Sequence, residues 1–273
     1  MRKLRIGELS GLVGANASAL RFWEERGITE PEKDSDNSYR LYSAEDSCRF
    51  LMARRYRSFG FSVDAAKALI GAADPEGGDA LLARRLAELD DEARRALALR
   101  DELARYRRAC SSARREVGRF EPDVLPASSY IFTIERGAFV GDSVRLELSR
   151  RWTDRLPFAS FALYVPREAF SGARECQVSW GFGLGDDHPD SRAVVEAARA
   201  AGMDILTMEA RRCVRTAFYR DDPRDMRPGE LSPVADAFRE AGYEASGPAI
   251  GHLLELDGAG DSTRYLYALY IPV

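Results

Sequence analysis

Histidine and cysteine are scarce in this chain of 273 residues. The few that occur are His188, His252, Cys48, Cys110, Cys176 and Cys213. The cysteines are widely spaced and form no C-x-x-C pair, so the sequence offers few ligands for a zinc site and no sign of a disulfide framework. We interpret the cysteines as buried free thiols that behave as small hydrophobic residues, and we expect no metal and no other cofactor.

Long apolar runs are also absent. Although 45% of the residues are hydrophobic, no run of about 18 apolar residues occurs. The first residues lack the apolar core of a secretory signal. These two absences predict a cytoplasmic protein that has no membrane partner.

Catalytic motifs are missing as well. The sequence contains no G-x-S-x-G, no H-E-x-x-H and no phosphate-binding glycine loop. The glycine-rich segment 181–185 follows an expected strand but lacks the rest of a dinucleotide-binding fingerprint, so we interpret it as a loop at the mouth of a pocket. The sequence therefore favours a binding protein over an enzyme.

The net charge of −4 conceals an asymmetry along the chain. Residues 1–120 hold 23 Lys and Arg against 20 Asp and Glu, whereas residues 121–273 hold 17 against 24. A mildly basic first half suits contact with a phosphate backbone, and an acidic second half suits a neutral or cationic partner.

Two short amphipathic segments separated by a turn open the chain. We expect one helix over about 6–13 and a second over about 17–26, with Asn16 as the N-cap of the second and Gly27 as its stop. Their inward-facing residues are expected to be Leu9, Leu12, Val13, Leu20 and Trp23. This is the pattern of a helix-turn-helix, whose second helix enters the major groove of DNA.

The polar, turn-rich stretch 29–42 ends in Tyr-Arg-Leu-Tyr and predicts a small β-hairpin, or wing. Ser43 and Asp46 form a capping box at the start of a helix that Gly60 ends. Ser62 caps one more short helix. The first 73 residues are therefore expected to form a winged helix-turn-helix domain.

A linker over 71–78 is expected to lead into one long helix over 79–118. A stripe of apolar residues with coiled-coil spacing follows this helix: Leu82, Leu86, Leu89, Ala93, Ala96, Leu99, Leu103, Tyr106, Cys110, Ala113 and Val117. A helix of this length spans about 60 Å and cannot bury its stripe against the small winged helix-turn-helix domain, which we call the head. We therefore expect a second copy of the chain to cover it, in a parallel or antiparallel homodimer.

Beyond two prolines, Pro122 and Pro126, the sequence becomes rich in aromatic and β-branched residues. Strands are expected over 130–135, 158–165, 175–181, 206–219 and 265–273, and helices over 142–156 and 233–241. The order β-α-β-β occurs about twice, which predicts an α+β domain over 125–273 built from two similar halves.

The blocks RIGELS, ALRFWEERG, YRLYS and R-x-F-G-F-S, in this order over about residues 4–70, resemble the MerR family of transcription regulators. The resemblance implies a homodimer with an antiparallel dimerisation helix that binds double-stranded promoter DNA. It also implies RNA polymerase as a partner at the promoter. Members that sense metals place cysteine ligands near the end of that helix, where this chain has Cys110 without a nearby partner in sequence.

Arginines dominate the residues that we expect to contact DNA. Arg21, in the front half of the second helix, can reach a phosphate or a guanine edge, and Arg40 on the wing can contact a phosphate. The full expected set is Ser18, Arg21, Phe22, Tyr39, Arg40, Arg54, Arg55 and Arg57. The chain departs from the family at three positions, with Phe22 for a tyrosine, Ser38 for a glycine and Ala19 for a threonine.

The closing string LYALYIPV, the strand before it and the doubled order resemble GyrI-like effector-binding domains. Such domains hold a small molecule in an aromatic pocket, with an acidic residue at its base in members that bind cations. The expected ligand-binding residues are Tyr130, Trp152, Tyr164, Trp180, Phe182, Tyr219, Glu255 and Tyr267. Glu255 is the main candidate carboxylate and Glu209 an alternative, because an aromatic cage with a carboxylate attracts flat cations.

These observations predict a ligand-responsive regulator that distorts promoter DNA and senses a small aromatic or cationic effector. Two alternatives stay open. In the first, the C-terminal domain is a small-molecule hydrolase with Glu255 as general base. In the second, the chain is an architectural DNA binder without a ligand.

Overall fold

The fold described here is that of a computed structural model, and it covers residues 2–35, 37–71, 75–135, 138–139, 143–173, 178–220, 231–258 and 264–273. The chain divides into two compact units, Met1–Ala96 and Leu97–Val273, and the long helix α5 (Pro75–Glu116) contributes to both. No described helix is long and apolar enough to cross a membrane.

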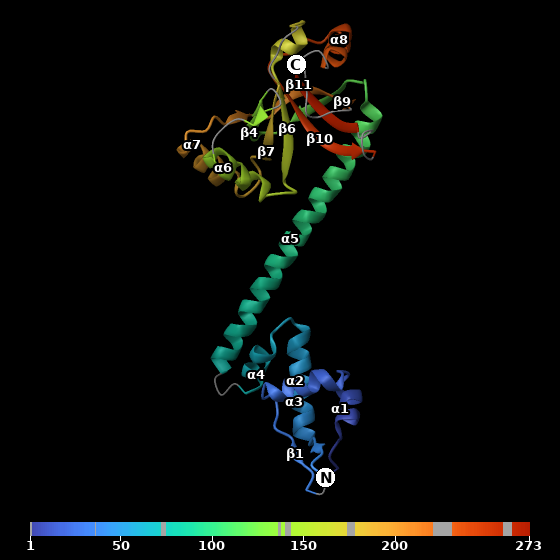
Figure 1. Cartoon of the computed structure of the whole chain (residues 1–273), viewed down its shortest axis with the longest axis vertical. Helices are drawn as coiled ribbons and strands as arrows, with labels where there is room; N and C mark the ends of the chain where they lie inside the picture. Colours follow the sequence, from blue (N-terminus) through green and yellow to red (C-terminus); the bar gives the residue numbers. More distant parts are fainter. Residues whose placement is uncertain are drawn as a thin grey trace. The chain divides into compact units, whose positions relative to one another are not determined.

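The first unit is a winged helix-turn-helix (Figure 1). Its elements in order are α1 (Ile6–Val13), α2 (Ala17–Glu25), β1 (Glu32–Lys33), β2 (Arg40–Leu41), α3 (Ala44–Ser58), α4 (Val63–Ile70) and the first turns of α5. The expected caps are confirmed at Asn16, at the Ser43–Asp46 capping box and at Ser62. Gly27 follows α2 in the left-handed conformation, with φ of +80°.

Four predicted inward residues form the core of this unit together with residues from the later helices. Leu9, Val13, Leu20 and Trp23 are buried, but Leu12 is 54% exposed, so its prediction is wrong. Leu9 and Val13 lie four positions apart on one side of α1, and an eight-residue helix that packs on a small core buries only that narrow stripe.

Helix α5 begins earlier than expected, at Pro75, so residues 75–78 are helical and not linker. Residues 72–74 of the expected linker lie outside the described residues. Proline suits the start of a helix because its missing N–H has no partner there in any case. The two glycines that follow are accommodated in the first turn.

Among the residues that the structure describes, the second unit forms an antiparallel sheet of nine strands, with its own short helices on one face. Its strands are β3 (Glu121–Leu125), β4 (Ser128–Glu135), β5 (Ala138–Phe139), β6 (Ala159–Val165), β7 (Ser179–Gly185), β8 (Leu206–Met208), β9 (Arg211–Arg220), β10 (Ala249–Asp257) and β11 (Arg264–Pro272). Its helices are α6 (Ser143–Thr153), the 3-10 helix η1 (Arg167–Ser171), α7 (Ser191–Ala200) and α8 (Ser232–Glu240).

The doubled order is confirmed. The first repeat is β4-α6-β6-β7 and the second is β9-α8-β10-β11. The sheet order β3-β9-β11-β10-β6-β7-β4-β5 places the second strands of the two repeats, β6 and β10, side by side at its centre. The mixed α and α+β class predicted from the sequence is therefore the observed one.

Helices α6 and α7 pack on the strands of the first repeat, and α8 packs on those of the second, all on the same face of the sheet. We call this the helix face. The opposite face packs against the last turns of α5, where Cys110 and Ala113 are buried. We call it the α5 face.

Several details differ from the sequence expectations. The segment 181–185 is part of strand β7 and not a loop, because Gly181 and Gly183 allow the backbone and a ring of β4 to approach closely. The expected strand 206–219 is divided into β8 and β9, and the first residues of the expected strand 175–181 lie outside the described residues. Strand β3 and helix α7 have no counterpart in the predictions; β3 contains Pro122, which an edge strand tolerates.

Candidate nucleic-acid interface

Helix α2 presents a polar outer surface because its inner positions are taken by Leu20 and Trp23. The side chain of Asn16 fixes the start of the helix by accepting a hydrogen bond of 2.7 Å from the backbone N–H of Ala19. Three of the expected contact residues lie exposed on α2: Ser18, Arg21 and Phe22. Arg21 forms no hydrogen bond or ion pair with any residue that the structure describes.

The wing consists of β1 and β2, which pair through Glu32–Leu41 and Lys33–Arg40. Tyr39, just before β2, is exposed and has the guanidinium of Arg5 5.9 Å from its ring centre. Ser38 has a φ of +60°, in the left-handed region that glycine favours. The turn of the wing thus keeps a glycine-type conformation although the chain has serine there.

The wing is tied to α2 through Glu24. Arg40 donates a hydrogen bond of 2.6 Å from Nε to one carboxylate oxygen of Glu24, and Tyr42 donates one of 2.9 Å to the other. Burial, and then the hydrogen bond to Glu24, raise the pKa of Tyr42 above its ordinary value, so its hydroxyl is a donor at neutral pH. Sequence reasoning missed Glu24; its only signal is an acidic residue directly after the buried Trp23.

The three expected arginines of α3 have different environments. Arg54 donates to the carbonyl of Val13 at the end of α1, and Arg57 donates to the carbonyl of Phe61. Arg54 therefore satisfies a carbonyl at the end of α1, and Arg57 satisfies one in the turn between α3 and α4. Arg55 is exposed and makes no side-chain hydrogen bond or ion pair within the described part of the chain.

In the second unit the eight expected ligand-binding residues do not converge on one site. Trp180, Phe182 and Tyr267 lie on the helix face of the sheet, with Trp152 of α6 buried beneath it. The remaining four contact the opposite, α5 face: Tyr130, Tyr164, Tyr219 and Glu255. Because neighbouring residues of a strand point to opposite faces, the sheet itself separates the two groups.

Glu255 forms an ion pair with an arginine of the same chain. Arg114 of α5 donates to both of its carboxylate oxygens, from Nε at 2.8 Å and from Nη2 at 2.6 Å. The pair lies beside a β-bulge between Leu253 and Glu255, and Tyr106 of α5 donates to the carbonyl of Leu254 in the same bulge. This geometry makes Glu255 an anchor for α5.

Comparison with known proteins agrees with the geometry of the first unit. The family model of the MerR helix-turn-helix regulatory proteins matches residues 4–72. The HTH-type transcriptional regulator CueR of Vibrio cholerae serotype O1 is 32% identical over 95 residues, which cover 34% of this chain and 68% of the relative. The chain belongs to the MerR family. The mercuric resistance operon regulatory protein of Bacillus cereus is 36% identical over 73 residues, which cover 26% of this chain and 54% of that protein.

Two solved structures resemble this MerR-family chain at low sequence identity. The EcmrR–DNA complex in EcmrR-RPo has 15% identity and a TM-score of 0.37, and the match covers 98% of each chain. The structure of SAV2435 bound to tetraphenylphosphonium has 12% identity and a TM-score of 0.32, and the match covers 56% of this chain and 93% of that one.

The cysteines of this MerR-family member are in two kinds of environment. Burial raises the pKa of Cys213 to about 11 and also raises that of Cys110, so both are neutral thiols at neutral pH. Cys48 is exposed, which corrects its interpretation as a buried thiol, and Cys176 lies outside the described residues. Within the described ranges, His, Cys, Asp and Glu side chains form no group of three or more that could hold a metal ion.

Proposed function

We propose that this MerR-family chain acts as a homodimer that binds a pseudo-palindromic promoter through two α2–wing surfaces. The carrying observation is the outer surface of α2, where Arg21 has no described partner while its neighbours on the inner side form the core. A guanidinium that forms no hydrogen bond or ion pair with the described residues is available to a phosphate or a guanine edge. Tyr39 and Arg40 extend the surface onto the wing.

A second copy of the chain is the proposed occupant of the apolar stripe on α5. Leu82, Leu86, Leu89, Leu99 and Leu103 are exposed in the single chain although they repeat at coiled-coil spacing. Exposed leucines along several helical turns have a strong tendency to associate. As the family resemblance implies, we propose an antiparallel pairing, which holds the two heads apart on one face of the DNA.

Such a dimer would act on transcription by deforming the promoter. Bending and twisting an overlong spacer realigns the two elements that RNA polymerase recognises, and the deformation energy depends on the spacer sequence. The output changes only if an effector binds two states of the dimer with different affinities.

The substitution Arg21→Ala tests the proposed interface. We expect the affinity for a selected operator to fall by about 5- to 150-fold, that is about 1–3 kcal/mol, because a charge-assisted contact is lost. The measurement is a titration of fluorescent duplex DNA at fixed salt. The control Arg94→Ala removes an exposed arginine from α5, outside the interface, and should leave affinity almost unchanged; equal affinities for Arg21→Ala and wild type would remove Arg21 from the interface.

For the second unit we propose an effector site on the helix face of the sheet, for an apolar aromatic molecule. The half-buried Trp180 meets Tyr267 edge-on at 5.4 Å, and Phe182 lies 5.3 Å from the exposed Phe161. Tyr267 is fully buried, so the rings that a flat ligand can reach and stack on are those of Trp180, Phe182 and Phe161. The carboxylate once expected to complete a cation site lies on the other face, so the proposal covers the aromatic character of the effector and not a positive charge.

Thermal unfolding in the presence of aromatic compounds tests this site. A ligand at 100 times its Kd should stabilise the folded protein by about 2.7 kcal/mol. The substitution Trp180→Leu should abolish the shift, whereas Tyr219→Leu, which removes a half-buried aromatic ring from the α5 face, should preserve it. Loss of the shift in both variants, or in neither, would contradict a site on the helix face.

A further inference from the structure

The corner between α3 and α4 has a backbone geometry that leaves room for a side chain from α5. Phe59 is the C-cap of α3, so its carbonyl has no partner within the helix. Gly60 follows with a φ of +93°. A Cβ atom at Gly60 would lie 2.7 Å from Nη2 of Arg85. The absence of a side chain at Gly60 therefore allows the guanidinium of Arg85 to lie against the backbone of this corner.

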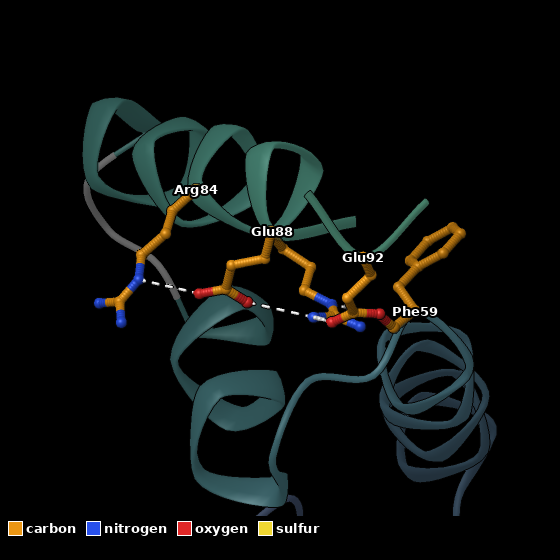
Figure 2. Close-up of polar contacts among 5 residues, drawn as sticks. Phe59, Arg84, Glu88 and Glu92 are labelled. Carbon is orange, nitrogen blue, oxygen red and sulfur yellow. Dashed lines mark hydrogen bonds and ion pairs between the residues drawn. The ribbon is translucent and has the colours of Figure 1, made fainter. Parts of the chain in front are cut away.

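Arg85 occupies that space and joins α5 to the DNA-binding head. Its Nε donates a hydrogen bond of 2.8 Å to the carbonyl of Phe59. Its Nη1 lies 3.1 Å from a carboxylate oxygen of Glu88 and 3.0 Å from one of Glu92, so two carboxylates of α5 orient the guanidinium. Figure 2 shows Glu88 and Glu92 on the side of α5 that faces Phe59. The Arg85 side chain is 20% exposed, whereas that of the adjacent Arg84, which pairs with Glu88 alone, is 79% exposed.

On the same turns of α5, each residue that faces the head is followed directly by a residue of the apolar stripe. Leu81, Arg85 and Glu88 are half-buried, at the spacing of one helix face. Leu82, Leu86 and Leu89 follow each of them by one residue, which is a rotation of about 100° around the helix. A rotation of α5 within the dimer would therefore pull Arg85 away from Phe59.

We propose that Arg85 is a positioning residue that fixes the direction of the dimerisation helix relative to the DNA-binding head, and thereby the half-site spacing that the dimer accepts. This inference rests on the proposed function. A planar guanidinium with three acceptors permits one orientation, whereas apolar packing alone tolerates sliding and rotation. Glu88 and Glu92 orient Arg85, and the carbonyl of Phe59 accepts its hydrogen bond. This carbonyl lies at the C-terminal end of α3, where the helix dipole favours a positive charge.

The test uses the full-length dimer and operators selected from random duplex DNA by the wild-type protein. Each operator is then lengthened or shortened by 2 base pairs between its half-sites, which rotates one half-site by about 70° relative to the other. The measured quantity is the ratio of the Kd for the altered spacer to the Kd for the selected spacer. Sedimentation and thermal unfolding establish that each variant is a folded dimer.

We expect a ratio of about 10 or more for the wild type, and a ratio at least about threefold smaller for Arg85→Ala, because the heads are then free to adopt other orientations. The matched control Arg84→Ala should keep the wild-type ratio. If Arg85→Ala does not fold, Arg85→Lys keeps the charge without the planar donor fork and should also reduce the ratio.

A folded Arg85→Ala or Arg85→Lys dimer with the wild-type ratio would overturn the positioning role while leaving the proposed function intact. An equal reduction in Arg84→Ala would also overturn it, because the described ion pair of Arg84 is with Glu88 of α5 and not with the head. Failure of the wild-type protein to select any duplex DNA would instead overturn the proposed function, and the inference would fall with it.

Discussion

A monomer is the expected result of replacing Leu86 and Leu103 by glutamate. These side chains are 62% and 67% exposed in the single chain, so the substitutions remove almost no packing within it. In a dimer they would place charges in the apolar stripe, where burial of an unpaired carboxylate is strongly unfavourable. We therefore expect association to be lost while the melting of each unit is retained.

The same double variant should bind operator DNA at least about 100-fold more weakly, because a linked second head binds at an effective concentration in the millimolar range and a monomer loses that advantage. Sedimentation equilibrium and DNA titration measure the two effects. Leu97→Glu is a matched control, since Leu97 is 51% exposed on the same helix but lies outside the stripe. Dimers that persist in the double variant, or that dissociate equally in the control, would contradict the proposed interface.

The structure limits the stripe available to a partner. The sequence pattern runs continuously to Val117, but Cys110 and Ala113 are buried within the single chain. Ala113 packs against Ala217, Leu266 and neighbouring residues of the chain's own sheet. Coiled-coil spacing shows only that a helix face is apolar, and both a second helix and a sheet satisfy that requirement. To decide between a second helix and a sheet, one must know where strands such as β9, which follow about 100 residues later in the chain, lie in space.

The first unit was largely predictable from sequence because its signals are local. Asn16, Ser43 and Ser62 each cap a helix through contacts within three residues, and glycines at the following turns fix where helices end. The core residues follow from helical spacing. Leu12 is the exception, since spacing alone does not show how wide a stripe a short helix buries.

The expected effector pocket was less predictable because it depends on strand pairing between distant segments. Alternation along one strand places Leu266 and Tyr267 on opposite faces of the sheet. It does not show which residues of β10 and of β7 share a face, because that depends on how both strands pair with β6 between them. A bulge at Leu253–Glu255 shifts that alternation in β10, and the partner of Glu255 is 141 residues away. The Arg85–Phe59 contact is hidden in the same way, because neither residue carries a sequence signal for the other.

The stability of the second unit should fall steeply in mild acid through His252. This histidine lies on the α5 face of β10, with its ring 5.6 Å from that of Tyr270. Its Nε2 is shielded from solvent and has no hydrogen-bond partner among the described residues. Burial lowers the pKa of His252 from 6.5 to about 4, because the protonated ring would lose its hydration.

A histidine whose pKa is lower in the folded state binds fewer protons there than in the unfolded chain. The free energy of unfolding therefore decreases as the pH falls below 6.5, and it stops decreasing through this group near pH 4. At pH 4.5 the expected loss relative to pH 7 is about 2–3 kcal/mol, at 1.36 kcal/mol for each unit of difference. The substitution His252→Leu removes the titrating group and should abolish this part of the loss.

Denaturant unfolding at pH 7 and pH 4.5 measures the effect as a difference between wild type and His252→Leu. Carboxylates such as Asp46, whose pKa is lowered by hydrogen bonds from Thr29 and Ser43 against the opposing effect of burial, lose their contribution at still lower pH and do so equally in both proteins. The difference between the two proteins thus isolates His252. If the wild type and the variant lose the same free energy of unfolding between these pH values, the ring of His252 is hydrated or paired in solution, and the packing of α5 against this face must be looser than the structure shows.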